Sequence, residues 1–213
     1  MPRSPRIQFS GAYYHVYNRG VEQRPIFLDD MDRKMFLKLL GEEVRRSDLR
    51  LFAYCLMENH YHLFLQILKP NLNRILQAVQ GHYAQYLNGR HGRVGALFQG
   101  RYKNRLVHED EYALTLLRYI HRNPLDAGLV KSLEDYRWSS YLSYIGKLPR
   151  WNWLETDWVF RQFSTDPALA SELFRLFHRT PSPPAEYKIL AQLNKPLGTQ
   201  RGQTPKPQKG SDP

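Results

Sequence analysis

Cysteine is almost absent from this chain, which has one, Cys55, in 213 residues. A single cysteine excludes disulfides within the chain and metal sites of the CxxC type. Apolar runs are also short, and none reaches the roughly 20 residues of a membrane-spanning helix. The basic N-terminal segment MPRSPRIQFSG is not followed by the apolar stretch of a signal peptide. We therefore expect a soluble protein of the reducing cytoplasm, with no membrane partner.

Acidic residues are in the minority, with 20 Asp and Glu against 31 Lys and Arg, so the net charge is +11. The sequence pI is about 9.8. This balance favours a polyanionic partner, with nucleic acid the first candidate, although a generally basic solvated surface is the alternative. Hydrophobic residues make up 42% of the chain, enough for a core in one domain with an appendage or in two small domains.

Hydrophobic periodicity predicts the elements of the first two thirds of the chain. Aromatic and β-branched runs predict strands over residues 12–18, 49–56, 60–68 and 98–107. Helical spacing of apolar residues predicts helices over 30–46, 72–87 and 109–122. Asn123-Pro124 is expected to end the last helix, because proline disfavours helical backbone in the residue before it. The order β-α-β-β-α-β-α predicts the α+β class, with helices packed on a ferredoxin-like antiparallel sheet.

The composition changes after about residue 148. Aromatic residues in WNWLETDWVFRQF are expected to pack back onto the core, and ALASELFRLFHR has the pattern of a short amphipathic helix. Proline, glycine and polar residues then dominate. We predict a main domain over 1–150, a helical extension over 151–196 and a disordered basic tail over 197–213.

Two histidines form the first candidate site. In a strand, residues two apart point to the same side, so His60 and His62 would present their imidazoles together. Neutral imidazoles bind divalent cations. The alternative is a pair of surface histidines without a ligand. Zinc is a poorer fit, because no third Cys or His follows at ligand spacing.

A second candidate pair lies four residues apart on the predicted third helix. Tyr119 and Asn123 would share one helical face, a single turn from each other. A phenol can act as a nucleophile when its oxyanion is stabilised, and an amide oxygen is a suitable ligand for Mg²⁺ or Mn²⁺. The alternatives are a core tyrosine and a helix-terminal asparagine.

Several motifs around these residues, in order, give the chain a family resemblance over about residues 7–146. It resembles the HUH-type Y1 transposases of the IS200 kind, and most of all the REP-associated tyrosine transposases. The matching segments are Tyr14-His15-Val16, Asn18-Arg19-Gly20, Ala53-Tyr54-Cys55-Leu56-Met57, Asn59-His60-Tyr61-His62-Leu63, Leu97-Phe98-Gln99-Gly100-Arg101-Tyr102-Lys103, Arg118-Tyr119-Ile120-His121, Asn123-Pro124, Ala127-Gly128 and Trp138-Ser139-Ser140-Tyr141.

The resemblance implies a fold, a reaction and roles for the candidate residues. Residues 1–150 would form an HUH endonuclease domain. His60, His62 and Asn123 would hold Mg²⁺ or Mn²⁺, and Tyr119 would attack single-stranded DNA to form a 5′-phosphotyrosine. Attack by a 3′-hydroxyl would then join strands, which makes the chain a nickase and strand transferase acting in transposition. The DNA partner implied is a hairpin with a flanking single strand.

Two positions depart from the family pattern. Glu58 stands where the family usually has proline, and it would either reshape the turn or add a carboxylate near the metal. Tyr61 is bulkier than the usual aliphatic spacer, but it is expected to face the opposite side of the sheet, in the core.

Basic residues are the expected DNA contacts, because cations track phosphates and aromatic faces stack unpaired bases. The candidates are Arg19, Arg93, Arg101, Lys103, Arg105, Arg118 and Arg122. Interleaved aromatic residues include Tyr13, Tyr14, Phe98 and Tyr102. The alternative is a solvated basic face over core aromatics. A further hypothesis is that the N-terminal arm, with Arg3 and Arg6, and the C-terminal tail touch a hairpin stem.

Other functions stay open on the residues alone. A domesticated hairpin-binding protein would bind DNA without cutting it, and a zinc-stabilised RNA-binding module would carry stoichiometric zinc. Related insertion-sequence enzymes are dimers whereas the repeat-associated type acts as a monomer, so a monomer is slightly favoured over a homodimer.

Overall fold

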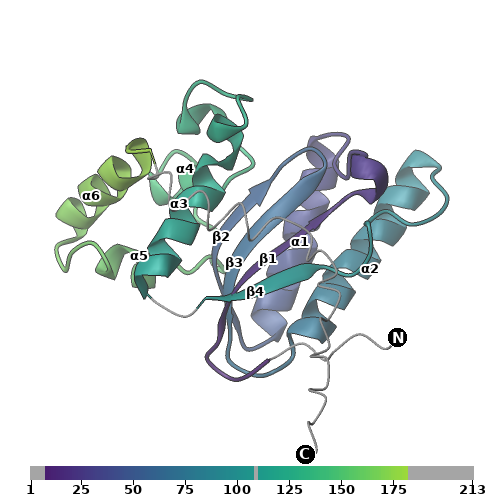
Figure 1. Ribbon diagram of the computed structural model, residues 1–213, viewed down its shortest axis with the longest axis horizontal. Helices are drawn as coiled ribbons and strands as arrows, with labels where there is room; N and C mark the ends of the chain where they lie inside the picture. Colours follow the sequence, from purple (N-terminus) through teal and green to yellow (C-terminus); the bar gives the residue numbers. More distant parts are fainter. Residues whose placement is uncertain (1–7, 108–109, 182–213) are drawn as a thin grey trace, which may run out of the picture. The chain divides into compact units, whose positions relative to one another are not determined.

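A computed structural model describes residues 8–107 and 110–181 of the chain. Within them, one antiparallel sheet has the strand order β2-β3-β1-β4 (Figure 1). Its strands are β1 Tyr13–Arg19, β2 Leu49–Leu56, β3 His60–Ile67 and β4 Lys103–Val107. The long helices are α1 Asp30–Arg46, α2 Leu72–His91 and α3 Asp110–Asp126. The predicted α+β class and the element order up to α3 are therefore confirmed.

Short elements follow or connect these. They are η1 Val21–Gln23, η2 Leu133–Asp135, α4 Tyr141–Tyr144, α5 Asp157–Arg161 and α6 Pro167–Arg179. The predicted helical extension 151–196 is described only to residue 181. Its remainder, the predicted tail 197–213 and the arm with Arg3 and Arg6 lie outside the described residues.

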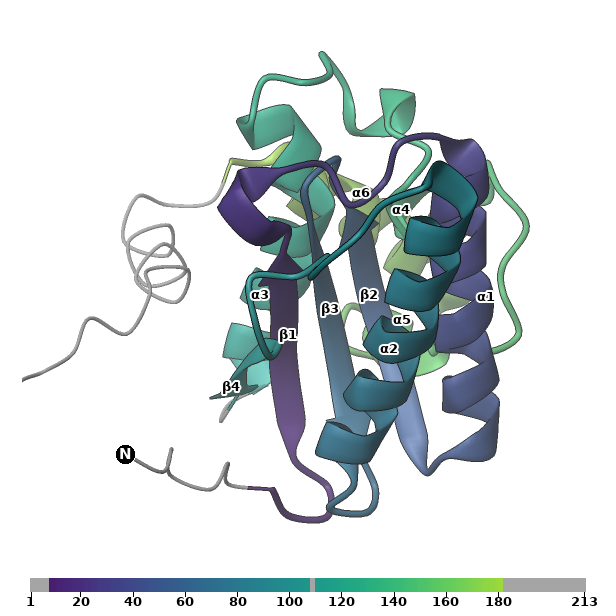
Figure 2. The ribbon, with the colours of Figure 1, turned by 90° about the vertical axis from the view of Figure 1, so that its right-hand side faces the viewer.

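The two faces of the sheet are covered by different helices. Helices α1 and α2 lie side by side on one face and α3 on the other (Figure 2). Helix α1 begins at Asp29, whose carboxylate accepts from the amides of Met31 and Asp32, completing a capping box. The strong N-cap explains why the predicted start of this helix is confirmed.

Aromatic rings fill the space between the sheet and the α1–α2 layer. Tyr61 on β3 packs against Phe36 on α1, with ring centroids 4.9 Å apart. Gln80 on α2 donates to the Tyr61 hydroxyl, so the buried phenol has a partner. Phe36 also meets Tyr83 edge to face at 5.2 Å. Tyr61 therefore faces away from His60 and His62, as the strand alternation predicts.

Three predicted boundaries are corrected. Helix α2 continues to His91, because Gly92 supplies a left-handed C-cap with φ 60°. Strand β4 begins at residue 103 instead of 98, after Gly100 at φ 130°. Helix α3 continues through Pro124 to Asp126. Only a short stretch follows the proline, and the Arg122–Asp126 ion pair and the bond from the Ala127 amide to the Asn123 carbonyl support it.

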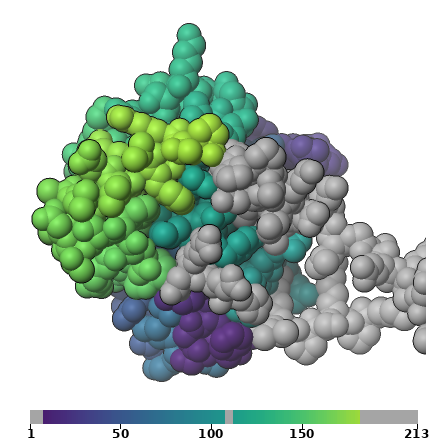
Figure 3. Space-filling model, turned by 60° about the vertical axis from the view of Figure 1, so that its left-hand side comes forward, coloured from purple at the N-terminus to yellow at the C-terminus, as the bar shows by residue number. Residues whose placement is uncertain are grey.

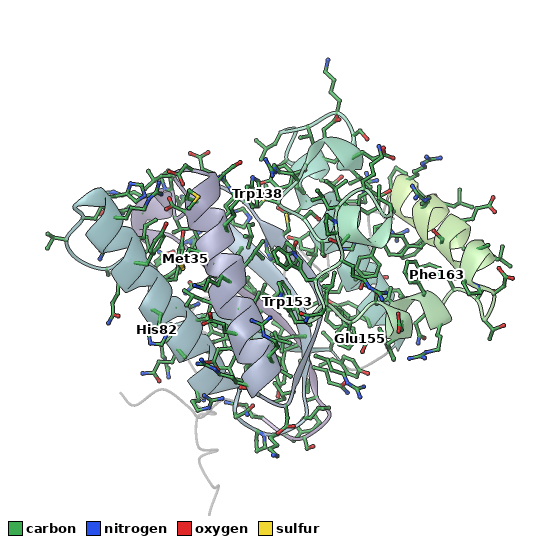
Figure 4. The ribbon with its side chains drawn as sticks, turned by 180° about the vertical axis from the view of Figure 1, so that it is seen from behind. Met35, His82, Trp138, Trp153, Glu155 and Phe163 are labelled. Carbon is green, nitrogen blue, oxygen red and sulfur yellow. The ribbon has the colours of Figure 1, made fainter. Side chains whose placement is uncertain are left out.

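The segment after residue 148 packs onto the core as expected. Leu154 forms an isolated bridge with Leu51 on the edge strand β2, and the Glu155 amide donates to the Leu51 carbonyl. Trp153 is buried against α1 at Gly41, where an added Cβ would lie 2.4 Å from the indole nitrogen (Figure 4). This close approach requires glycine at position 41.

Helix α6 packs on α3, and its surface adjoins that of α3 in Figure 3. A buried hydrogen-bonded chain joins them: His178 Nδ1 lies 2.8 Å from the Phe174 carbonyl, and His178 Nε2 lies 2.9 Å from His121 Nδ1. His121 Nε2 lies 2.7 Å from Ser140 Oγ. A carbonyl only accepts, so each ring must carry its proton on Nδ1 and Ser140 must donate to His121. The ring nitrogens of His178 and His121 and the hydroxyl of Ser140 therefore all have hydrogen-bond partners.

Candidate metal and nucleophile site

The two motif histidines lie on β3 and face α3. Their ring centroids are 5.0 Å apart and the rings are nearly perpendicular. His62 is buried, with 3% of its surface exposed, whereas His60 is half-buried at the end of the strand. The strand alternation therefore brings the two imidazoles together on one face of the sheet.

The surroundings of His60 fix which ring nitrogen is open. Its Nδ1 lies 2.7 Å from the amide oxygen of Asn59, and the Asn59 amide nitrogen donates to the Gln23 carbonyl at 3.1 Å. An amide oxygen only accepts, so Nδ1 of His60 carries the proton and Nε2 keeps its lone pair. The ring is also hydrogen-bonded by the side chain of Asn123 on α3. Two of the three predicted ligands are thus in contact.

His62 contacts a histidine that was not among the predicted site residues. Its Nδ1 lies 2.9 Å from Nε2 of His15 on β1, and the two rings are stacked with centroids 5.1 Å apart. His15 is fully buried. Tyr17, two residues further along β1, is the strand partner of His62, and their rings lie 5.8 Å apart.

The predicted nucleophile lies directly over these rings. Tyr119 on α3 meets His62 edge to face at a centroid distance of 5.7 Å, and His15 at 6.2 Å. Only 8% of its surface is exposed. Asn123 follows one turn later on the same helix. The structure therefore assembles Tyr119, His60, His62 and Asn123 from one chain.

Burial keeps the imidazoles neutral. It lowers the pKa of His15 to about 3, with Arg105 adding to the effect, and it lowers the pKa of His62 well below its usual value. The pKa of His60 is lowered by burial, while the Asn123 contact opposes that shift. Neutral imidazole is the form that binds a metal ion. Two imidazoles and an amide oxygen could hold one divalent cation and leave its remaining positions open for substrate oxygens.

Three of the predicted DNA-binding cations lie on the same sheet face. Lys103 and Arg105 on β4 pair with Tyr17 and His15 in register, and Arg19 pairs with His60. Burial lowers the pKa of Lys103, and repulsion from Arg19 and Arg105 adds to that shift. The strand register thus places Lys103 near both Arg19 and Arg105, and the three cations form a positive patch beside the histidines.

The structure does not bring the other four predicted cations into this cluster. Arg118 and Arg122 are buried between α3 and α6: the Arg118 guanidinium lies 4.2 Å from the Phe177 ring centroid, and Arg122 donates to the His178 carbonyl at 2.9 Å. They hold the two helices together. Arg93 donates to the Pro25 carbonyl in the β1–α1 connection, and Arg101 is exposed before β4.

The aromatic residues named as stacking candidates are packed instead. Tyr14, Phe98 and Tyr102 are buried, and Tyr13 contacts Phe52. The core alternative therefore holds for the three buried rings, whereas Tyr13 is half-buried. Glu58 is an exposed turn residue whose carbonyl accepts from the amides of Ile26 and Phe27, which ties the turn to the β1–α1 connection.

A separate acidic group lies at the α1–α2 end of the molecule. Asp29, Asp32 and His91 have ligand atoms close enough together for one ion. Arg90 already occupies this position: its Nη1 lies 2.8 Å from Asp29 Oδ1 and 2.6 Å from Asp32 Oδ1. The arginine pairs with both carboxylates and anchors the end of α2 to the start of α1, so these residues form an ion-pair network.

Sequence reasoning missed His15, Asn59 and Tyr17 as site residues. His15 and Tyr17 are two residues apart, as are His60 and His62, so strand alternation predicts that the members of each pair share one face. Only the β1–β3 register shows that both pairs share one face. Asn59 adjoins His60 in sequence, and its role depends on the turn that directs its amide to Gln23.

Comparisons with known proteins identify the family and the fold of the chain. The profile of the family "Transposase IS200 like" matches residues 8–123, more than half of the chain. A solved REP-associated tyrosine transposase bound to a REP hairpin matches with a TM-score of 0.60 at 14% identity, over 73% of this chain and 98% of that one. A Deinococcus radiodurans protein assigned as a candidate transposase matches with a TM-score of 0.39 at 18% identity, over 57% and 97%. No curated protein matches.

The fold is thus that of a Y1 transposase, a four-stranded antiparallel sheet between helical layers. The chain belongs to the IS200-like transposase family. Among the described residues, no helix has the length and apolarity needed to cross a membrane.

Proposed function

We propose that the chain cuts and rejoins single-stranded DNA through a 5′-phosphotyrosine on Tyr119. The observation that carries the proposal is the convergence on one sheet face of two neutral imidazoles, an amide and a phenol. A transposase of similar fold is bound to a REP hairpin, which supports a hairpin with a flanking single strand as the substrate.

The proposed reaction assigns a role to each of these groups. The Tyr119 oxygen loses its proton and bonds to phosphorus, and the bond from phosphorus to the 3′ oxygen breaks. The 3′ oxygen leaves as a hydroxyl, while the 5′ end stays on the tyrosine. A divalent cation, Mg²⁺ or Mn²⁺, held by His60, His62 and Asn123 would polarise the phosphate and stabilise its developing charge. Attack by a 3′-hydroxyl on the phosphotyrosine reverses the step without ATP.

The cations of the sheet face would bind the DNA strand. Arg19, Lys103 and Arg105 lie beside the proposed metal position, where they would hold phosphates on either side of the scissile one. A polyanion would offset the repulsion that Arg19 and Arg105 add to the effect of burial in lowering the pKa of Lys103.

One chain would suffice for the site. Tyr119 lies over His62 of the same chain, and the α6 contacts of Arg118 and Arg122 hold α3 in that place. We therefore propose a monomer. Light scattering on the active protein would show a mass near 25.2 kDa, and activity confined to a dimer would contradict this.

The test is covalent capture of DNA. The protein is incubated with end-labelled single-stranded hairpin DNA and Mn²⁺ or Mg²⁺, then separated on a denaturing gel. We expect a protein-linked label that disappears with chelator and with Tyr119→Phe. Tyr17→Phe is the matched variant, since it removes the other phenol beside His62, and its adduct should persist on Tyr119.

Two outcomes would contradict the proposal. An adduct that survives Tyr119→Phe would show that another group is the nucleophile. Tight hairpin binding without any adduct would show a domesticated DNA-binding protein.

A further inference from the structure

His15 is a buried polar residue that the reaction above does not use. It lies on β1 with none of its surface exposed, and its Nε2 is 2.9 Å from Nδ1 of His62. Its other ring nitrogen, Nδ1, is buried without a hydrogen-bond partner. Buried polar atoms nearly always have a hydrogen-bond partner, so a buried histidine with one nitrogen lacking a partner requires an explanation.

The hydrogen bond between the two rings contains one hydrogen, which is bonded either to Nε2 of His15 or to Nδ1 of His62. If His15 donates, the neutral His62 ring carries its own proton on Nε2 and has no lone pair for a cation. If His62 donates from Nδ1, its Nε2 is bare and His15 carries its proton on Nδ1. Only the second arrangement leaves His62 able to bind a metal ion.

His60, the neighbouring proposed ligand, has a partner of the same kind, supplied by the residue that precedes it in the sequence. Nδ1 of His60 donates to the Asn59 amide, which leaves its Nε2 open. His62 lies in the strand interior, where its sequence neighbours point to the other face, so its partner must come from another element that shares its face. His15 supplies it, because the β1–β3 register places it diagonally across from His62.

We propose that His15 is a positioning residue that accepts the Nδ1 proton of His62 and so holds the His62 Nε2 ready for the divalent cation. This inference rests on the proposed function. No other contact of the described residues fixes the His15 proton, because its Nδ1 has no partner. The ring can therefore take the acceptor form that metal binding requires. Partners of this kind set the tautomer and orientation of metal-binding histidines.

A histidine partner differs from the carboxylate that often fills this position. His15 is an imidazole beside Arg105, so it adds no negative charge to the site. A carboxylate would offset part of the charge of the cation. The neutral partner leaves the field of the cation and of the neighbouring Lys103 and Arg105 to act on a phosphate.

Two substitutions separate this role from packing. His15→Phe keeps a ring but removes the acceptor, and His15→Gln places an amide oxygen where Nε2 stood. Mn²⁺ affinity of the full chain is measured by calorimetry, with folding checked by near-ultraviolet circular dichroism. We expect roughly 10–100-fold weaker Mn²⁺ binding for His15→Phe and affinity close to wild type for His15→Gln. His82→Gln, which removes an exposed histidine on α2 (Figure 4), controls for surface binding and should change nothing.

Wild-type affinity in His15→Phe, or an equal loss in both variants, would overturn the proposal. If His15→Phe does not fold, nitrogen NMR of the Mg²⁺-loaded wild-type protein decides: a proton on His62 Nδ1 supports the role and a proton on Nε2 overturns it. The proposed function can be refuted independently of the role of His15. A wild-type protein whose Mn²⁺ affinity depends on His15 as expected, but which forms no DNA adduct, would refute the reaction and leave the positioning role in place.

Discussion

The two faces of the sheet are built from the same strands and differ completely in chemistry. On the α1–α2 face, Tyr61, Phe36 and Tyr83 form a dry aromatic cluster whose hydroxyls are bonded to protein atoms. On the α3 face, histidines, a tyrosine and cations converge. Neighbouring residues such as Tyr61 and His62 thus serve stability and chemistry separately. The comparison implies that a change on one face should leave the property of the other intact.

The largest effect should come from the α1–α2 face. Phe36→Ala removes a fully buried ring that contacts Tyr61, Tyr83 and Phe27. We expect a loss of about 3–5 kcal/mol in the free energy of unfolding, from lost burial and the cavity left behind. Urea denaturation measures it. Mn²⁺ affinity of the folded variant should match wild type, and a parallel loss of affinity would show that the two faces are coupled.

A substitution at a proposed metal ligand tests whether the α3 face can be changed without loss of stability. His60→Ala removes a half-buried ring at the end of β3 and its contact with Asn123. We expect Mn²⁺ affinity to fall by at least about 100-fold, more than the change of a supporting partner produces. The urea midpoint should move little, because the ring contributes little to the core. Unchanged Mn²⁺ binding would remove His60 from the ligand set.

Buried histidines on the α3 side predict that stability depends on pH. Burial lowers the pKa of His178 to about 3 and that of His121 well below its usual value. Both rings are neutral when folded, whereas in the unfolded chain they take up protons below about pH 6.5. Unfolding therefore binds protons, and stability falls as the pH drops below 6.5. Each such histidine should remove about 2 kcal/mol by pH 5, since the slope is about 1.4 kcal/mol per pH unit.

Urea denaturation at pH 7.5 and pH 5.0 measures this dependence. His178→Gln should flatten it by about one proton, although the variant starts from lower stability. Equal stability of the wild-type protein at the two pH values would contradict the neutral state of the buried rings.

The smallest effect is expected for single cations of the α3 face. Lys103→Gln removes one charge beside Tyr17, whose ring centroid lies 5.9 Å from the ammonium. Affinity for a single-stranded hairpin should fall modestly, and the slope of log affinity against log salt should drop by about 1. Lys131→Gln, at a position outside this cluster, is the matched control. Equal effects of the two would show that only net charge matters.

Much of this molecule follows from local patterns. Period-two alternation placed His60 and His62 on one face, and an Asp cap with helical spacing fixed the first helix, because both signals depend on residues close in sequence. Pro124 misled the prediction of where α3 ends. Its effect on the backbone is local, but Arg122, Asp126 and Ala127 sustain the helix beyond it.

The roles of charged and buried polar groups could not be predicted in the same way. Arg118 and Arg122 adjoin Tyr119 in sequence and looked like DNA contacts, but α6 covers them and uses them to dock. Their burial depends on α6, which begins more than forty residues further along the chain. Residues 151–179, expected to be an extension, include α6, which packs on α3 and contacts Arg118 and Arg122.

The sequence by itself determined the element order, the pair of imidazoles on β3 and the one-turn spacing of Tyr119 and Asn123, because strand and helix periods are set by the backbone. Only the tertiary structure decided which residues meet. Strand register placed His15 against His62, and helix packing brought Tyr119 over it. Those contacts join residues 47 and more positions apart, a distance at which no local pattern carries information.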